Sequence, residues 1–519
     1  MALKWANNHG IKNWMLGFTL LFSVTVFSQP TITQFSPNYG TIGSVVTITG
    51  TNLNNPTAIT IGGVSAIPVS NNGSTLVALV MPGATTGIVS VTTGAGTANS
   101  AGNFIVISSA APSIQQGSKL VGTDAVGAAE QGFSVALSAD GNTAIVGGYF
   151  DNSNIGAAWV YTRNGNSWTQ QGSKLVGTGA VGSDIRQGVS VSLSADGNTE
   201  MVGGYRDNNL VGAVWVYTRT AGVWTQQGNK LVGSDVAGTS RFGRSVALSP
   251  DGNTALIGGW GDNNDAGAAW IFTRSGGVWT QQGNKLLGTG KVGNSEQGGA
   301  IALSADGNTA ITGGWADNTY AGAAWIFSRS GNDWIQQGNK LVGSGAIGNA
   351  RQGLSVAVSA DGNTAIVGGF GDNGNIGAAW VYTRSGSVWS QQGNKLVGSG
   401  AVGSALQGYS VSLSADGNTA IIGGNGDNGN SGASWIFSRS GNTWTEVGSK
   451  IIGTGAIGNA RQGRGVAISL DGRTAIAAGD ADNSLAGAAW IFGSPLPAPT
   501  ITSFSPVSAG MGTTMTIVG

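Results

Sequence analysis

Aspartate is the residue with the most regular spacing in this 519-residue chain. Carboxylates can bind metal ions, transfer protons or accept hydrogen bonds from a ligand, so this spacing could serve several kinds of chemistry. In one set each aspartate precedes glycine: Asp140, Asp196, Asp251, Asp306, Asp361, Asp416 and Asp471. In a second set each precedes asparagine: Asp151, Asp207, Asp262, Asp317, Asp372, Asp427 and Asp482. Successive members lie 55 or 56 residues apart, which indicates one structural unit copied seven times.

The second set has aromatic residues beside it in most copies. Two positions before the aspartate stand Tyr149, Tyr205, Trp260, Trp315 and Phe370, with Asn425 and Asp480 in the last two copies. Aromatic rings can stack on a ligand while carboxylates hydrogen-bond to it. We therefore hypothesise a glycan- or protein-binding surface made of Tyr149, Asp151, Tyr205, Asp207, Trp260, Asp262, Trp315, Asp317, Phe370 and Asp372. The structural alternative, which turn chemistry favours, is that Asp-Asn forms Asx-turns in each loop and the aromatic rings pack inside the fold.

Composition excludes several kinds of catalytic site. Histidine occurs only at position 9, inside an N-terminal segment expected to be removed, and cysteine is absent. Ser-His-Asp and Cys-His catalysis, and zinc sites built on imidazole or thiolate, are therefore excluded from the remaining chain. The formal net charge is zero and basic runs are absent, so no nucleic-acid partner is expected.

Glycoside hydrolysis by a pair of carboxylates is compatible with this composition. The acids that break the repeat are Glu130, Glu200, Glu296 and Glu446. Because glutamate is usually exposed, we interpret these four as solvated surface residues. We expect a protein that is not an enzyme and has no cofactor.

One repeat contains four candidate strands. In the first full copy they are residues 134–138, 143–147, 157–162 and 168–171. The first two flank Asp140-Gly-Asn142, a strong signal for a tight hairpin. Four short antiparallel strands per repeat, arranged radially, form a propeller blade. The predicted fold class is therefore all-β, with a seven-bladed β-propeller at 113–493.

The array begins with the fourth strand of a repeat and ends with a third strand. A copy of the segment that follows each blade starts at Gln115. The last repeat, around Trp490, lacks the second tryptophan that the other repeats contain. We predict that residues 114–120 form the outer edge of the last blade and close the ring, which removes open sheet edges. An open β-solenoid of seven rungs is the alternative. Strand alternation places the Asp-Asn loops on the same face as the connections between repeats.

The N-terminal segment predicts export. Residues 1–28 contain Lys4 and Lys12 followed by an uncharged, mostly apolar run, as in secretory signal peptides. This run is shorter than the roughly 20 residues that span a bilayer. We expect a secreted or cell-surface protein with no transmembrane segment in this chain.

The residues that flank the array suggest a second kind of domain. Short alternating runs at 29–107 suit a small antiparallel sandwich. Ile32, Phe35, Pro37 and Gly40 give it the opening of the IPT/TIG family of immunoglobulin-like domains, which it resembles. The resemblance implies a spacer or adhesive module of extracellular bacterial proteins. Residues 108–112 form a linker, and 497–519 repeat the start of this domain, so we expect a second, incomplete TIG domain and a longer parent protein.

The array also resembles a known family. Phe242-Gly243, within the segment 241–259, resembles the start of FG-GAP repeats, the units of the integrin α-subunit propeller. The resemblance implies a propeller whose loop face binds ligand, and calcium held by Asp-x-Asp-x-Asp-Gly loops. Here that loop reads Ser-Ala-Asp-Gly-Asn-Thr, with one carboxylate, whereas Ca²⁺ prefers six to eight oxygens. We expect no metal at these turns.

Together these features favour a non-catalytic extracellular binding or adhesion protein. Its propeller is expected to be monomeric and to present near-equivalent loops to a glycan or protein ligand. A carbohydrate-active enzyme or accessory module on the same scaffold is one alternative. A structural spacer of a larger surface protein is another.

Overall fold

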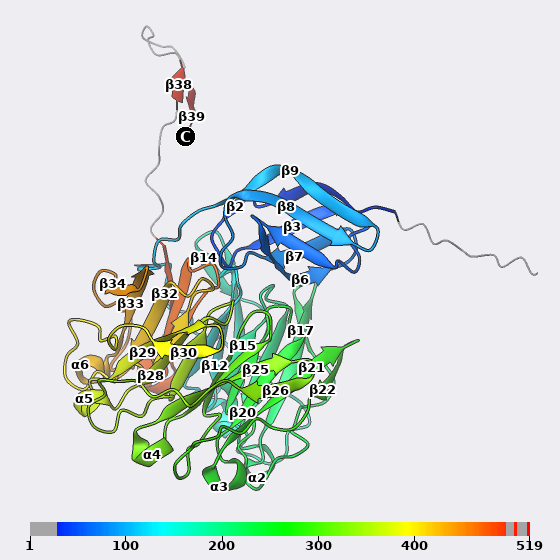
Figure 1. Cartoon of the computed structure of the whole chain (residues 1–519). Coiled ribbons are helices and arrows are strands. Elements are labelled where there is room, and N and C mark those ends of the chain that lie inside the picture. Colours follow the sequence, from blue (N-terminus) through cyan, green and yellow to red (C-terminus); the bar gives the residue numbers. More distant parts are fainter. Residues whose placement is uncertain (1–27, 495–502, 506–515, 519) are drawn as a thin grey trace, which may run out of the picture.

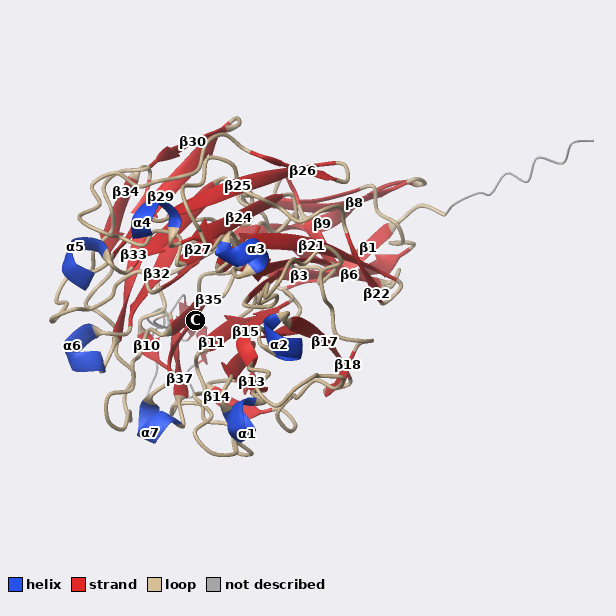
Figure 2. Ribbon diagram, turned by 90° about the horizontal axis from the view of Figure 1, so that it is seen from below, coloured by secondary structure: helices blue, strands red, loops and turns tan. Residues whose placement is uncertain are grey.

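The computed structural model describes residues 28–494, 503–505 and 516–518. A β-sandwich lies on one face of a ring of seven four-stranded antiparallel sheets (Figures 1 and 2). The all-β fold class, with an immunoglobulin-like domain followed by a seven-bladed propeller, is confirmed.

The sandwich consists of two sheets with strand orders β1-β3-β7-β6 and β2-β9-β8-β4-β5. Its strands are β1 (Thr31–Ser36), β2 (Tyr39–Gly40), β3 (Val45–Thr51), β4 (Ala58–Ile61), β5 (Val64–Ser65), β6 (Ile67–Asn71), β7 (Thr75–Leu79), β8 (Gly87–Thr93) and β9 (Gly96–Val106). Alternate residues of β3 and β8 are buried because each strand has one face in the core. That core gathers Val46, Ile48, Leu76, Val89 and Phe104.

Each blade consists of four strands, which follow chain order from the centre of the ring outward in every blade except the last, whose outer strand is β10 (Ile114–Gln115). The first strands are β11 (Ser134–Leu137), β15 (Gln187–Leu193), β19 (Ser245–Leu248), β23 (Ala300–Leu303), β27 (Ser355–Val358), β31 (Ser410–Leu413) and β35 (Gly465–Ile468). The second strands are β12 (Thr143–Gly148), β16 (Thr199–Gly204), β20 (Thr254–Gly259), β24 (Thr309–Gly314), β28 (Thr364–Gly369), β32 (Thr419–Gly424) and β36 (Thr474–Gly479).

The third strands are β13 (Ala157–Asn164), β17 (Ala213–Thr220), β21 (Ala268–Ser275), β25 (Ala323–Ser330), β29 (Ala378–Ser385), β33 (Ala433–Ser440) and β37 (Ala488–Gly493). The fourth strands are β14 (Ser167–Gln170), β18 (Val223–Gln226), β22 (Val278–Gln281), β26 (Asp333–Gln336), β30 (Val388–Gln391), β34 (Thr443–Glu446) and, for the last blade, β10 (Ile114–Gln115). The second strands are almost fully buried because neighbouring blades cover both of their faces, whereas the fourth strands are half exposed.

Ring closure by the N-terminal segment is confirmed. Strand β10 pairs antiparallel with β37, with Ile114 opposite Gly493 and Gln115 opposite Phe492. The Gln116 amide also donates to the Ile491 carbonyl at 2.8 Å. The last blade is therefore built from both ends of the array, and the first strands of the first and last blades are neighbours.

A buried tryptophan in each third strand packs the blades together. Trp215 is fully buried, and a Cβ added at Gly177 would lie 2.1 Å from its Cδ1 atom. Glycine is required there because the indole occupies the space of a side chain. Gln187 fixes the same loop, since its Oε1 atom accepts from the Gly177 amide at 2.6 Å. In the third blade Phe242 takes the glutamine's place and packs edge-on against Trp270.

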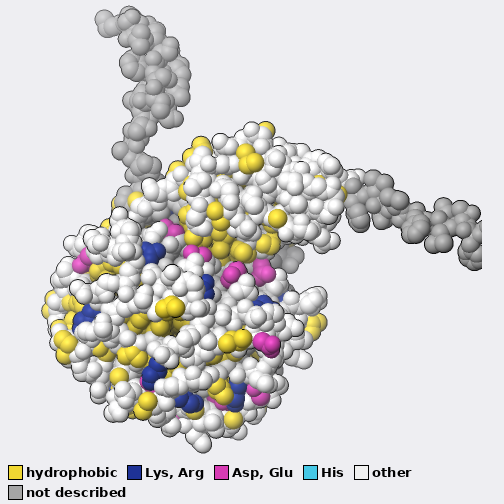
Figure 3. Space-filling model, in the orientation of Figure 1, with side chains coloured by type: hydrophobic (Ala, Val, Ile, Leu, Met, Phe, Trp, Pro, Cys, Tyr) yellow, Lys and Arg dark blue, Asp and Glu magenta, His cyan; other side chains and the backbone are white. Residues whose placement is uncertain are grey.

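The sandwich covers the propeller face that carries the Asp-Gly turns. Leu79 and Met81 of the sandwich share one apolar cluster with turn alanines of five blades: Ala139, Ala195, Ala305, Ala360 and Ala415. The Thr41 hydroxyl donates to the Asp471 carbonyl at 2.8 Å. Residues 29–118, which include the whole sandwich, contain no charged residue, and Figure 3 shows the sandwich without charged side chains. An uncharged domain therefore caps one end of the ring.

Two predictions concern residues outside this description. The signal peptide predicted at 1–28 lies outside the described residues except for Ser28. Most of the second TIG domain predicted at 497–519 also lies outside the described residues. Within that segment β38 (Ser503–Ser505) pairs antiparallel with β39 (Thr516–Val518), as β1 pairs with β3.

Candidate functional site

Each Asp-Asn loop forms a four-residue helical turn on the face opposite the sandwich (Figures 1 and 2). The turns are α1 (Asp151–Asn154), α2 (Asp207–Leu210), α3 (Asp262–Asp265), α4 (Asp317–Tyr320), α5 (Asp372–Asn375), α6 (Asp427–Asn430) and α7 (Asp482–Leu485). In α3 the two central residues, Asn263 and Asn264, have φ of 50° and 58°. Asparagine tolerates this left-handed conformation better than most residues, which explains why it follows each aspartate.

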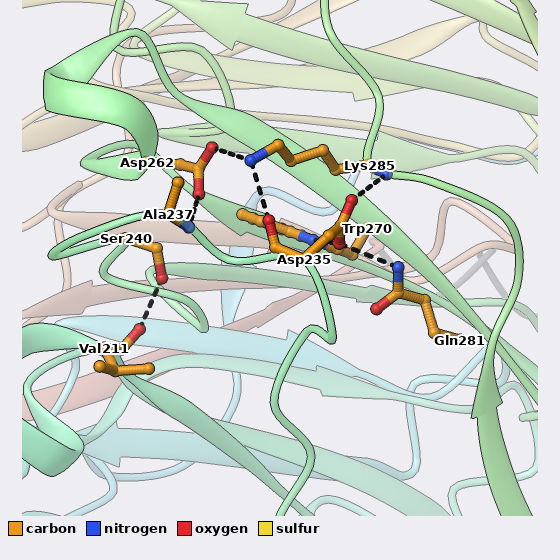
Figure 4. A network of polar contacts seen from close by, with 8 residues as sticks. All are labelled: Val211, Asp235, Ala237, Ser240, Asp262, Trp270, Gln281 and Lys285. Carbon is orange, nitrogen blue, oxygen red and sulfur yellow. Dashed lines mark hydrogen bonds and ion pairs between the residues drawn. The ribbon is translucent and has the colours of Figure 1, made fainter.

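The aspartate that opens each turn is buried in an ion pair. Asp262 is 0% exposed; its Oδ2 atom lies 2.6 Å from Lys285 Nζ and its Oδ1 atom accepts from the Ala237 amide at 2.7 Å (Figure 4). The lysine also donates to the Asp235 carbonyl at 2.9 Å. The carboxylate thus joins the connection entering the blade, its own loop and the connection leaving it.

The same arrangement occurs in all seven blades. The pairs are Asp151–Lys174, Asp207–Lys230, Asp262–Lys285, Asp317–Lys340, Asp372–Lys395, Asp427–Lys450 and Asp482–Lys119. Each aspartate also accepts a backbone amide from the preceding connection. Asp151, Asp207, Asp262, Asp317 and Asp372 therefore have a structural role, through these contacts and not through Asx-turns. Both carboxylate oxygens of each are engaged by these contacts, and their predicted role in a ligand-binding surface stays a prediction.

The Asp-Gly turns do not fit calcium. Both carboxylate oxygens of Asp140 are occupied: Oδ1 accepts from the Ser138 hydroxyl at 2.6 Å and Oδ2 from the Asn142 side-chain amide at 2.8 Å. One carboxylate, already engaged, falls well short of the oxygen cage of a Ca²⁺ site. Among the described residues, no group of three or more His, Cys, Asp or Glu side chains is placed to hold a metal ion.

Three positions in each repeat differ strongly between copies, and the structure brings them to one mouth of the central channel. The first position precedes Gln-Gly or Phe-Gly: Glu130, Arg186, Arg241, Glu296, Arg351, Leu406 and Arg461. The second follows it: Phe133, Val189, Arg244, Gly299, Leu354, Tyr409 and Arg464, all of which line the channel. The third is the predicted aromatic position, occupied by Tyr149, Tyr205, Trp260, Trp315, Phe370, Asn425 and Asp480. Otherwise similar blades thus display different side chains at the mouth.

One side of the mouth is an aromatic pocket of about 350 Å³. Its lining includes Trp260, Trp315, Phe370, Tyr320 and Tyr409, with Arg244, Glu296, Arg351, Leu354 and Gly299. Gly299 stands where the other blades carry a side chain. A Cβ there would lie 3.3 Å from the Glu296 carbonyl oxygen, 3.6 Å from Trp315 Cδ1 and 3.9 Å from Trp260 Cβ, so Gly299 adds no side chain beside the two tryptophans.

Polar groups in this pocket are buried without partners. Among the described residues, Trp260 Nε1, Glu296 Oε2 and Arg351 Nε have no hydrogen-bond partner. Burial, with the charge of Asp265 adding to it, raises the pKa of Glu296 to about 7, although Arg241 opposes the shift. The pocket therefore offers hydrogen-bonding groups of both kinds among aromatic faces.

The other predicted aromatic residues lie elsewhere around the mouth. The Tyr149 ring centroid lies 4.1 Å from that of Phe133 and 4.4 Å from that of Phe150, with Arg186 above the Tyr149 ring at 5.4 Å. Tyr205, like Tyr149, is partly buried and is close enough to Arg244 to influence its pKa. The structure thus gathers three of the five predicted aromatic residues into one pocket.

Sequence reasoning missed the arginines, Gly299 and Tyr409, and interpreted Glu296 as a solvated surface acid. The signal that identifies them is variation between copies of the repeat: Arg351 aligns with Glu296, and Gly299 with Arg244 and Tyr409. Glu296 is half-buried and lines the pocket. That interpretation was wrong for Glu296 because the loop before the first strand turns its side chain toward the channel. It was also wrong for Glu200, which is 0% exposed in the buried strand β16.

Family models match both parts of the chain. Residues 30–106 match the IPT/TIG domain and residues 224–272 match the FG-GAP repeat. The chain thus contains one segment that matches the TIG domain and one that matches the FG-GAP repeat. The matched FG-GAP repeat includes Phe242-Gly243, where Phe242 takes the place of the buried glutamine of the other blades.

Among solved structures, the chain is similar to hydrazine synthase of Kuenenia stuttgartiensis, with 14% identity and a TM-score of 0.43. The alignment covers 69% of this chain and 94% of that one. The search of curated proteins found no match. Within the described part of the chain, no helix is long and apolar enough to cross a membrane.

Proposed function

We propose that this TIG–FG-GAP propeller is a non-catalytic extracellular binding or adhesion protein, and that its ligand is a glycan or protein held at the channel mouth opposite the TIG domain. The proposal includes secretion or cell-surface location, for which the N-terminal sequence is the support.

One observation carries the proposal. Seven near-identical blades differ strongly at positions that converge on one mouth, and there they form an aromatic pocket with unpartnered buried polar atoms. Packing alone gives no reason for such differences, because equivalent positions in a symmetric ring have equivalent neighbours. Ligand binding gives a reason for these differences, since an asymmetric ligand needs different contacts on different blades.

A carbohydrate-active enzyme is the second candidate. Glu296 favours it, because a carboxyl group with a pKa of about 7 is suited to donate a proton. A second carboxylate across the scissile bond would also be needed. Its nearest candidate, Asp265, is half exposed and already paired with Arg241 at 2.8 Å. Binding is therefore the function that the site supports better.

A glycan array probed with the purified protein tests the proposal, and each hit is then incubated with excess protein and checked for cleavage. We expect saturable binding that Trp260→Ala and Trp315→Ala each weaken at least tenfold, since loss of a stacking ring costs about 1.4 kcal/mol or more. Trp224→Ala, on an outer strand, is the control. Release of reducing ends would indicate the enzyme, and absence of any glycan or protein ligand would leave the spacer role.

A further inference from the structure

Two arginines in the aromatic pocket differ from the other arginines at the channel mouth. Arg186 pairs with Asp184 at 2.5 Å, Arg241 with Asp265 at 2.8 Å, and Arg464 with Asp480 at 3.1 Å. Among the described residues, Arg244 and Arg351 form no ion pair, and both line the pocket. The pocket therefore holds two cations that form no ion pair, and the acid that lines it with them is Glu296, whose charge acts on Arg244.

Arg351 is held in place by aromatic rings. Its guanidinium lies 4.9 Å from the centroid of Phe370, 5.6 Å from Tyr320 and 5.9 Å from Trp315. These contacts fix the position of the cation but use none of its N–H donors, and its Nε atom is buried without a partner. A guanidinium prearranged in this way suits an anion with two oxygens in one plane.

Arg244 comes from the other side of the same pocket. Burial lowers the pKa of its guanidinium, which lies 5.8 Å from the Phe133 ring. Burial of a cation without an ion pair is costly, and an anionic ligand would offset that cost. Gly299 lines the same pocket and adds no side chain beside Trp260 and Trp315.

We propose that this pocket binds an anionic sugar residue, with its carboxylate or sulfate group on Arg351 and Arg244 and its pyranose ring against Trp260 and Trp315. The inference rests on the proposed binding function and names the ligand class for it. The pocket volume of about 350 Å³ suits one or two sugar rings, and the pocket pairs cations with apolar faces, as an acidic sugar requires.

Isothermal titration calorimetry of the full chain at pH 6 tests the inference. The probes are trigalacturonate, its methyl ester and a trisaccharide of sulfated galactose. Wild-type protein should bind an anionic probe about tenfold or more tighter than the ester, because a hydrogen bond to a charged group contributes roughly that much. Whichever of the two anionic probes binds more tightly identifies the source of the anion.

Three variants complete the design. Arg351→Gln should reduce binding of the anion to the level of the ester, while Arg329→Gln, on the outer side of a blade, should leave it unchanged. Gly299→Leu should abolish binding of every probe by filling the space, and it introduces the residue that the next blade carries at Leu354. Thermal unfolding of each variant shows whether the fold has survived.

The outcomes separate the two proposals. Equal affinity for the acid and the ester, or no effect of Arg351→Gln, would overturn the anionic subsite. If binding then still depended on Trp315, the binding function would stand. If none of the three probes bound, the anionic subsite would be rejected, and the glycan array alone would decide the broader function.

Discussion

Asp262 and Lys285 form an ion pair of 2.6 Å in which the carboxylate is completely buried and the lysine is mostly covered. The pair ties the connection leaving the blade to the loop between its second and third strands. Because the unit is repeated, seven such pairs surround the ring on the face that carries α1–α7. They hold the loops that carry the variable residues.

Asp262→Asn should destabilise the propeller by about 3 kcal/mol or more, since it leaves a covered ammonium group without its counter-charge. The matched control is Asp333→Asn, the same change at an exposed aspartate of β26. Chemical denaturation followed by tryptophan fluorescence measures both. Equal midpoints for the two variants would show that the buried pairs contribute nothing to stability.

Glu200→Ala should stabilise the protein by about 1–3 kcal/mol at neutral pH. Glu200 is 0% exposed, stands where the other blades have alanine, and has no hydrogen-bond partner for either oxygen among the described residues. Burial raises its pKa well above the ordinary 4.5, so the folded protein holds the proton more tightly than the unfolded chain. Stability of the wild type should therefore fall as pH rises above about 4.5, and the variant should lose this dependence.

The reciprocal change is the control for Glu200. Ala365→Glu places the same group at the equivalent, fully buried position of another blade. It should lower the melting temperature and add a second decrease of stability with rising pH. A melting temperature of Glu200→Ala at or below that of the wild type would contradict the account of Glu200.

Gln116→Pro should weaken ring closure, because proline lacks the amide that donates to the Ile491 carbonyl. We expect a loss of about 1–3 kcal/mol and faster limited proteolysis of the last blade. Ser113→Pro, just before β10 at an exposed residue, should behave like wild type. Identical proteolysis of all three proteins would show that the N-terminal strand does not hold the ring closed.

Affinity for an anionic ligand should decrease between pH 6 and pH 8. Glu296 has a pKa of about 7, so it is mostly neutral at the lower pH and negatively charged at the higher one, where it repels the ligand. The charges of Asp265, Arg241 and Arg244 also act on this group. Calorimetry at both values, with Glu296→Gln expected to bind equally at each, measures the effect. A wild-type affinity independent of pH would refute it.

The architecture was predictable because it rests on local rules repeated seven times. Asp140-Gly141 marks a hairpin in one repeat and therefore in all, and the offset between Gln115 and Trp490 predicts the closing strand. The site was harder to predict, since the repeat draws attention to residues that recur. The recurring Asp262 proved structural, whereas the pocket depends on positions that vary between copies, such as those of Gly299 and Arg351.

The TIG domain changes what can reach the ring. Because it packs over the turns of at least five blades, the central channel is open toward the α1–α7 face and covered on the other. The channel is therefore closed at one end, and a polymer chain cannot pass through it. A long glycan would have to enter by its terminus or by a branch, or lie across the rim, so chain ends and side groups should matter more for recognition than chain length.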